Sequence, residues 1–110
     1  MGKVKTGQME DPIEQNVITH VVMWRLKAGS PPSAPDELKE KLEAMSGRIP
    51  GLLSVEAGID VRRRDNSADL VLITRFRDAD ALERYHSHPA HREVVAFAAQ
   101  VQEFSLVVDY

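Results

Sequence analysis

The sequence contains no cysteine. This absence excludes disulfide bonds, a thiolate nucleophile and any metal site with sulfur ligands. It is compatible with the reducing environment of the cytoplasm, where we expect the protein to be located. Long apolar runs are also absent: none approaches the roughly 20 residues that a helix needs to cross a bilayer, and the first residues lack the apolar stretch of a signal peptide. We therefore expect no membrane partner.

Positive charge is scarce as well. The 14 basic residues are outnumbered by 17 acidic ones and the formal net charge is −3, so no broad cationic surface is expected for nucleic acid or anionic lipid. The one basic run, Arg62 to Arg64, precedes Asp65 and Asn66 and is typical of a solvated turn. The composition predicts no nucleic-acid partner.

A single domain is expected from a chain of 110 residues with 43% hydrophobic content. Residues 1–16 are polar and without hydrophobic periodicity, which predicts a flexible N-terminal extension, whereas residues 17–110 carry the patterns of a folded domain. Residues 1–6 also match the N-myristoylation pattern, with Gly2 as the acceptor, although nothing else in the chain supports a lipid anchor.

Four segments have the composition and alternation of β-strands, at residues 17–27, 53–61, 70–76 and 104–110. The first is apolar on both faces, with Val21 and Met23 on one side and, on the other, Ile18, His20, Val22, Trp24 and Leu26. Such a strand needs a cover on each side, so we expect helices on one side and a partner on the other. The second alternates strictly, which predicts one inward face made of Leu53, Val55, Ala57, Ile59 and Val61.

Two helical regions separate these strands. The first is predicted to begin at Ser33, an N-cap candidate in a Ser-x-x-Asp arrangement, and to end before Pro50. The second begins at the N-cap candidate Asp78 and is interrupted at Pro89, because the residue before a proline avoids helical geometry. The order βαββ, broken helix, β predicts an α+β, ferredoxin-like fold with a four-stranded antiparallel sheet and helices on one face. The bare face predicts a homodimer, with the two open sheet faces packed together.

Residues 85–91 hold three of the four histidines together with a tyrosine, and this cluster concentrates the proton chemistry available near neutral pH. His91 precedes two valines by three and four residues, so it is expected on the core face of its helix. Convergence of His20, Tyr85 and His91 on one cavity would provide an imidazole base and a phenol that stabilises an enolate. The candidates are Tyr85 and His91 for catalysis and, for ligand contact, His20, Val22, Trp24 and His88.

A structural interpretation of the same residues stays open beside this one. His88 is also a candidate cap for the second helical segment, His91 a candidate donor to a backbone carbonyl, and Tyr85 a core residue with its hydroxyl at the edge. Trp24 is in the first place a core residue. The spacing His86-x-His88-x-x-His91 predicts splayed rings with no carboxylate or cysteine to complete a site, so we expect neither a metal nor another cofactor.

Four parts of the sequence resemble the stress-responsive A/B barrel (Dabb) family over roughly residues 17–110: residues 18–24, Ile49-Pro50-Gly51-Leu52, the Tyr-x-x-His-Pro-x-His segment, and Val108-Asp109-Tyr110. The resemblance implies a dimeric α+β barrel. Most members have no established activity, but one plant member cyclises a polyketide with a tyrosine and a histidine that match Tyr85 and His91. A first-strand histidine of that pocket matches His20, whereas a third-strand histidine is replaced here by Leu70.

Two functions follow as hypotheses. The first is a homodimeric barrel that binds a small hydrophobic ligand between sheet and helices. The alternative is a cofactor-independent enzyme of the polyketide cyclase or isomerase type, with His91 as general base and Tyr85 orienting the carbonyl oxygen. A cavity that touches both residues and His20 distinguishes the pocket from the purely structural interpretation.

Overall fold

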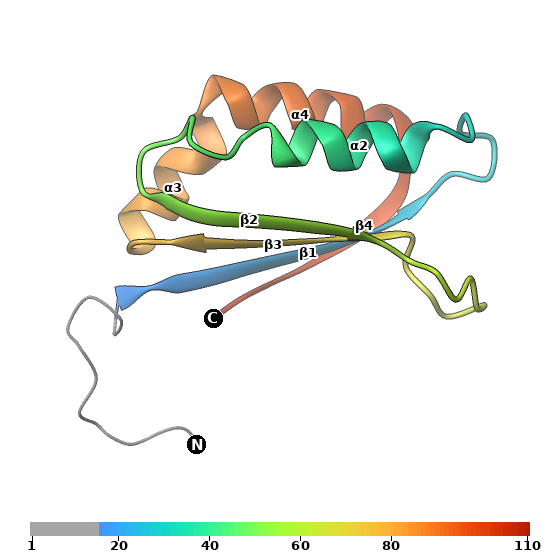
Figure 1. The fold of residues 1–110 in the computed structure, drawn as a ribbon, viewed down its shortest axis with the longest axis horizontal. Helices are drawn as coiled ribbons and strands as arrows, with labels where there is room; N and C mark the ends of the chain where they lie inside the picture. Colours follow the sequence, from blue (N-terminus) through green and yellow to red (C-terminus); the bar gives the residue numbers. More distant parts are fainter. Residues whose placement is uncertain (1–15) are drawn as a thin grey trace, which may run out of the picture.

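The computed structural model describes residues 16–110 (Figure 1). The predicted extension and its myristoylation pattern lie outside the described residues, apart from Asn16. The elements follow the predicted order: β1 (Ile18–Leu26), α2 (Ala34–Glu43), β2 (Leu52–Ile59), β3 (Leu70–Phe76), α3 (Ala79–Ser87), α4 (Pro89–Val101) and β4 (Gln102–Asp109).

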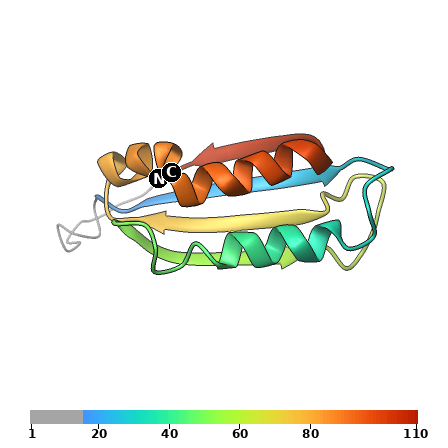
Figure 2. The same ribbon diagram turned by 90° about the horizontal axis from the view of Figure 1, so that it is seen from above.

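The four strands form one antiparallel sheet in the order β2-β3-β1-β4. The helices α2, α3 and α4 lie on the same face of this sheet, and α2 and α4 run side by side along it (Figures 1 and 2). The predicted α+β, ferredoxin-like architecture is confirmed. Within residues 16–110, no helix is long and apolar enough to cross a membrane.

The core lies between the sheet and the helices. β1 places its even-numbered residues against the helices, and β3 does the same. The helices contribute side chains at helical spacing. The largest fully buried side chains come from the helices, from β3 and from the segment after α2: Leu38, Leu42, Met45, Leu70, Leu72, Thr74, Phe76 and Tyr85. Each buried aliphatic side chain of this size stabilises the fold by about 1.5–3 kcal/mol relative to an exposed one.

The opposite face of the sheet is not covered by any element of residues 16–110. Cross-strand pairs such as Met23 with Leu106 and Val21 with Val108 place apolar side chains on it. Met23 is 41% exposed and Leu106 60% exposed. The prediction of a strand with two apolar faces is therefore confirmed, and only one of these faces is buried within the chain.

Two caps define the helices that carry the histidine cluster. Asp78 accepts a hydrogen bond from the Ala81 N–H at 2.8 Å, so its predicted role at the start of α3 is confirmed. His88 ends α3 and begins α4 with an extended backbone, and its Nδ1 accepts from the Ala90 N–H at 3.0 Å. The predicted break before Pro89 is confirmed as well, and it separates α3 and α4 into two helices.

Two details of the sequence prediction are wrong. Ser33 occupies the N-cap position of α2 as predicted, but its hydroxyl makes no cap hydrogen bond, because its backbone is already helical (φ −81°, ψ −5°). In β2, Leu53 is 55% exposed because the register shifts between Leu52 and Ser54, which disrupts the alternation. Val61 is 87% exposed because it lies beyond the end of that strand.

Gly51 provides a test of how closely α3 is held against the start of β2. It has a φ of +84°, and a Cβ there would lie 2.5 Å from the Ala81 Cβ. Gly47 has a similar φ of +78° but nothing within 4 Å. We expect Gly47→Ala to lower the free energy of unfolding by about 1–2 kcal/mol, the usual cost of a left-handed backbone for an L-residue. Gly51→Ala should cost a further 1–3 kcal/mol or so from overpacking.

Urea denaturation of the two variants measures this difference. Equal losses of stability in both would contradict the close approach of Gly51 to α3.

Candidate functional site

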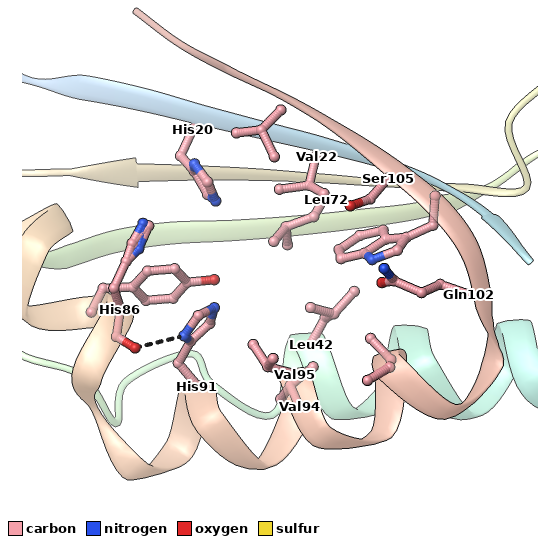
Figure 3. Close-up of a pocket in the computed structure, with 15 residues that line it drawn as sticks. His20, Val22, Leu42, Leu72, His86, His91, Val94, Val95, Gln102 and Ser105 are labelled. Atoms are coloured by element: carbon pink, nitrogen blue, oxygen red, sulfur yellow. Dashed lines mark hydrogen bonds between the residues drawn. The ribbon is translucent and has the colours of Figure 1, made fainter.

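A cavity of about 300 Å³ lies between the sheet and the helices (Figure 3). Its walls come from β1, β3 and β4 on one side and from α2, α3 and α4 on the other. Most of the wall is apolar, with Val22, Leu42, Leu72, Val94 and Val95 among its residues. Three of the candidates, His20, Tyr85 and His91, meet at one end of this cavity.

His20 reaches the cavity from the central strand. It is 5% exposed, and its Nδ1 lies 2.5 Å from the Oδ1 of Asp109, its cross-strand neighbour on β4. An ionised carboxylate is only an acceptor, so Nδ1 carries the proton and donates a hydrogen bond to Asp109. This hydrogen bond fixes the orientation of the His20 ring, which projects into the cavity (Figure 3). Because the bond uses Nδ1, Nε2 remains available to a ligand.

His91 is held in one tautomer by the backbone. Its Nδ1 lies 3.3 Å from the carbonyl oxygen of His86, and because a carbonyl only accepts, Nδ1 is the donor and Nε2 bears the lone pair. Burial lowers the pKa of His91. The hydrogen bond to the His86 carbonyl raises this pKa, whereas the nearby charges of His86 and His20 lower it further. The neutral imidazole with a free Nε2 is the form required of a general base.

The break in the helix makes this bond possible. In an unbroken helix the His86 carbonyl would accept from the N–H of residue 90. Here the Ala90 N–H is bound to His88 Nδ1 instead, so the carbonyl is free to accept from the His91 ring. His88 therefore does not line the cavity itself but holds the local backbone that orients His91.

Tyr85 is 1% exposed and lies between Phe76 and His91, with ring centroids 4.8 Å and 4.1 Å away. Its hydroxyl makes no hydrogen bond with any group in residues 16–110, although the residue lines the cavity. Burial raises the pKa of the Tyr85 phenol, so it is a hydrogen-bond donor throughout the physiological pH range.

His86, which is not among the predicted site residues, also lines the cavity. Its ring lies 5.8 Å from that of His20 and 5.7 Å from those of Tyr85 and His91, measured between centroids. Successive helical residues are separated by about 100°, so the side chain after Tyr85 lies at the boundary of the inner face. Because His86 remains exposed, it lines the cavity where the cavity meets solvent.

The structure thus brings together five of the six candidates, Tyr85, His91, His20, Val22 and Trp24, and leaves His88 outside the cavity. Sequence reasoning missed Asp109, His86, Gln102 and Ser105. Only the pairing register of β1 with β4 could have revealed Asp109, since it lies 89 residues from His20. Within residues 16–110 there is no group of three or more histidine, cysteine or acidic side chains that could hold a metal ion.

A model of the stress responsive A/B barrel domain (Dabb) matches residues 18–110. The uncharacterized protein SCO4036 of Streptomyces coelicolor is 31% identical over 96 residues, which are 86% of this chain and 98% of the relative. Two solved structures share the fold. A dimeric ferredoxin-like protein of unknown function from Bacteroides fragilis has a TM-score of 0.77 at 23% identity and covers 86% of this chain and 94% of its own. A hydroxynitrile lyase from Passiflora edulis has a TM-score of 0.75 at 15% identity, and the match covers 86% of this chain and 92% of the lyase.

The lowered pKa of His91 can be measured by NMR titration of its Cε1 proton. We expect a midpoint below 6.5, and an upward shift in His86→Ala, which removes a nearby charge but keeps the backbone carbonyl. Because the unfolded chain takes up this proton at higher pH than the folded chain, stability should fall as the pH drops below 6.5. Ser87→Ala is the control that leaves the midpoint unchanged, and a wild-type midpoint at or above 6.5 would contradict the prediction.

Proposed function

The chain belongs to the stress-responsive A/B barrel domain family, and from its cavity we propose that it binds a small, mainly hydrophobic compound carrying a carbonyl group. The observation that supports this most directly is the Tyr85 hydroxyl, a donor on the cavity wall without an acceptor in residues 16–110. Buried tyrosine hydroxyls normally have a partner. A ligand oxygen would supply one, while the valine and leucine side chains along the cavity would contact the apolar remainder.

A cofactor-independent enzyme is the second candidate, and the tautomer of His91 favours it. His91 Nε2 removes a proton from the carbon next to the carbonyl. The C–H electron pair forms a carbon–carbon double bond and the π pair of the carbonyl moves to its oxygen, which gives an enolate. Tyr85 donates a hydrogen bond to that oxygen and stabilises the charge that develops on it. The enolate carbon then either regains a proton, which isomerises the compound, or attacks a second carbonyl of the same molecule, which closes a ring.

His20 and Asp109 support the final proton transfer of this reaction. Asp109 accepts a hydrogen bond from His20 Nδ1 and so holds the His20 ring beside that of Tyr85, with the ring centroids 5.8 Å apart. A ring held in this way is positioned to exchange a proton at its Nε2. We assign to His20 the exchange of the proton that an alkoxide or enolate requires at the end of the reaction.

The open face of the sheet supports a homodimer as the functional form. Apolar side chains of β1 and β4 are exposed there, Leu106 by 60% and Val108 by 54%. Such a continuous apolar surface is typical of an interface. The Bacteroides fragilis protein that shares this fold is dimeric. The cavity lies on the other side of the sheet, so two sheets packed face to face would leave both cavities accessible.

Proton exchange at carbon tests the enzymatic proposal. We expect the protein to accelerate deuterium uptake next to the carbonyl of benzylacetone in D₂O, followed by proton NMR. His91→Gln should reduce the rate by about 100-fold or more and Tyr85→Phe by roughly 10- to 100-fold, the ranges typical of a general base and an oxyanion donor. The rate should also fall at acid pH with a midpoint below 6.5, because protonation removes the His91 lone pair.

Arg92→Gln, an exposed position next to His91 on α4, is the matched control and should leave the rate unchanged. Equal rates in the wild type and His91→Gln would exclude His91 as the base. Binding without catalysis would then remain if benzylacetone still raised the melting temperature of the wild type.

Light scattering after size-exclusion chromatography tests the dimer. The wild type should have about twice the mass of one 12.3 kDa chain, and Leu106→Asp should give a monomer because it buries a carboxylate in the interface. Val61→Asp introduces the same charge at an apolar residue that is 87% exposed outside the open face, and it should remain dimeric. A monomeric wild type at micromolar concentration would rule the homodimer out.

A further inference from the structure

The end of the cavity opposite the histidines is also polar. Gln102 and Ser105 lie there, separated from His20, His86 and His91 by apolar side chains (Figure 3). Trp24 belongs to the same end, because it is the cross-strand partner of Ser105 and lines the cavity. The cavity therefore has two polar ends, both built on strands and helix ends of the fold.

None of these three side chains has a hydrogen-bond partner in residues 16–110. The Trp24 indole N–H lacks an acceptor although the residue is only 7% exposed, and neither the Ser105 hydroxyl nor the Gln102 amide is bonded to a protein group. Their backbone is fixed: the Gln102 N–H donates to the Ala98 carbonyl where α4 ends. Trp24 is buried and Gln102 and Ser105 are half-buried, and all three line the cavity. Their polar groups are therefore available to a ligand that occupies this end of it.

The three groups are also uncharged, and none of the described residues that line this end of the cavity is cationic. A carboxylate or phosphate buried there would lack a compensating charge, which is costly. A hydroxyl or carbonyl oxygen would instead accept from the indole and the amide and, in the case of a hydroxyl, donate to Ser105 or to the amide oxygen.

We propose that Trp24, Gln102 and Ser105 form a second binding subsite, which recognises a neutral hydroxyl or carbonyl oxygen at the far end of the ligand. His20 and Trp24 are four residues apart on β1, a Cα separation of roughly 13 Å at the rise of a strand. The ligand is therefore an elongated molecule with a carbonyl at the histidine end, an apolar middle and a neutral oxygen at the other end. This inference rests on the proposed function, because it deepens the description of the same cavity.

A matched pair of ketones tests the subsite. Benzylacetone has the carbonyl and the apolar ring, and para-hydroxybenzylacetone adds one neutral hydroxyl at the opposite end. The chain has a single tryptophan, Trp24, and it lines the cavity, so quenching of its fluorescence reports occupancy by either ketone. We expect the hydroxylated ketone to bind about tenfold more tightly to the wild type, the gain expected from one well-formed hydrogen bond.

Two variants remove the hydrogen-bonding groups without changing the backbone. Ser105→Ala and Gln102→Leu should each reduce the affinity for the hydroxylated ketone by about three- to tenfold and leave that for benzylacetone within about twofold. Their matched controls are Ser54→Ala on the exposed part of β2 and Gln100→Leu on the exposed side of α4, which should bind both ketones as the wild type does.

The outcomes separate this inference from the proposed function. If both ketones bind the wild type equally, or if the preference for the hydroxyl survives in both variants, the subsite is wrong and the binding of a carbonyl compound stands. If neither ketone binds, both the subsite and the proposed function are overturned. If the preference for the hydroxylated ketone is lost in Ser105→Ala and Gln102→Leu but kept in the two control variants, the subsite is established, whether or not proton exchange is catalysed.

Discussion

The geometry of the site depends on one capping interaction at the break between α3 and α4. His88 Nδ1 binds the Ala90 N–H, and this bond replaces the helical one that would otherwise occupy the His86 carbonyl. The free carbonyl then accepts from His91 and selects its tautomer. A residue outside the cavity thus determines which nitrogen of His91 faces the ligand. Proline in the first turn of α4 makes the arrangement stable, because it has no N–H to satisfy and favours an extended residue before it.

Successive side chains of β1 point to opposite faces of the sheet, and the two faces have different roles. One set of alternate residues enters the core and the cavity, where His20 and Trp24 mark its two polar ends. The other set, with Met23 at 41% exposure, remains uncovered in the single chain. The cavity also leaves polar groups such as the Tyr85 hydroxyl without partners in residues 16–110, at a cost in stability that a solidly packed core would avoid. Ligand binding would supply partners for the polar groups of the cavity, and dimerisation would cover the apolar face of the sheet.

Most of the fold was predictable because its signals are local. Asp78 and Pro89 define the helix ends from their immediate neighbours, and the apolar residues of β1 and α4 recur at the periods of a strand and a helix. The errors occurred where a long-range contact overrides such a rule. Leu53 follows the alternation of a strand, but the irregular pairing of β2 with β3 exposes it. His86 is polar and next to a helix end, but the position of β1 brings the His20 ring to it.

By itself the sequence determined the order of the elements, the helix break and the inward direction of Tyr85 and His91, because periodicity and capping act over a few residues. Tertiary structure alone decided the rest of the site. The pairing of β1 with β4 joins His20 to Asp109 across 89 residues and sets Ser105 beside Trp24. Such a register results from the packing of all strands and helices together, and no short stretch of the chain contains the information to specify it.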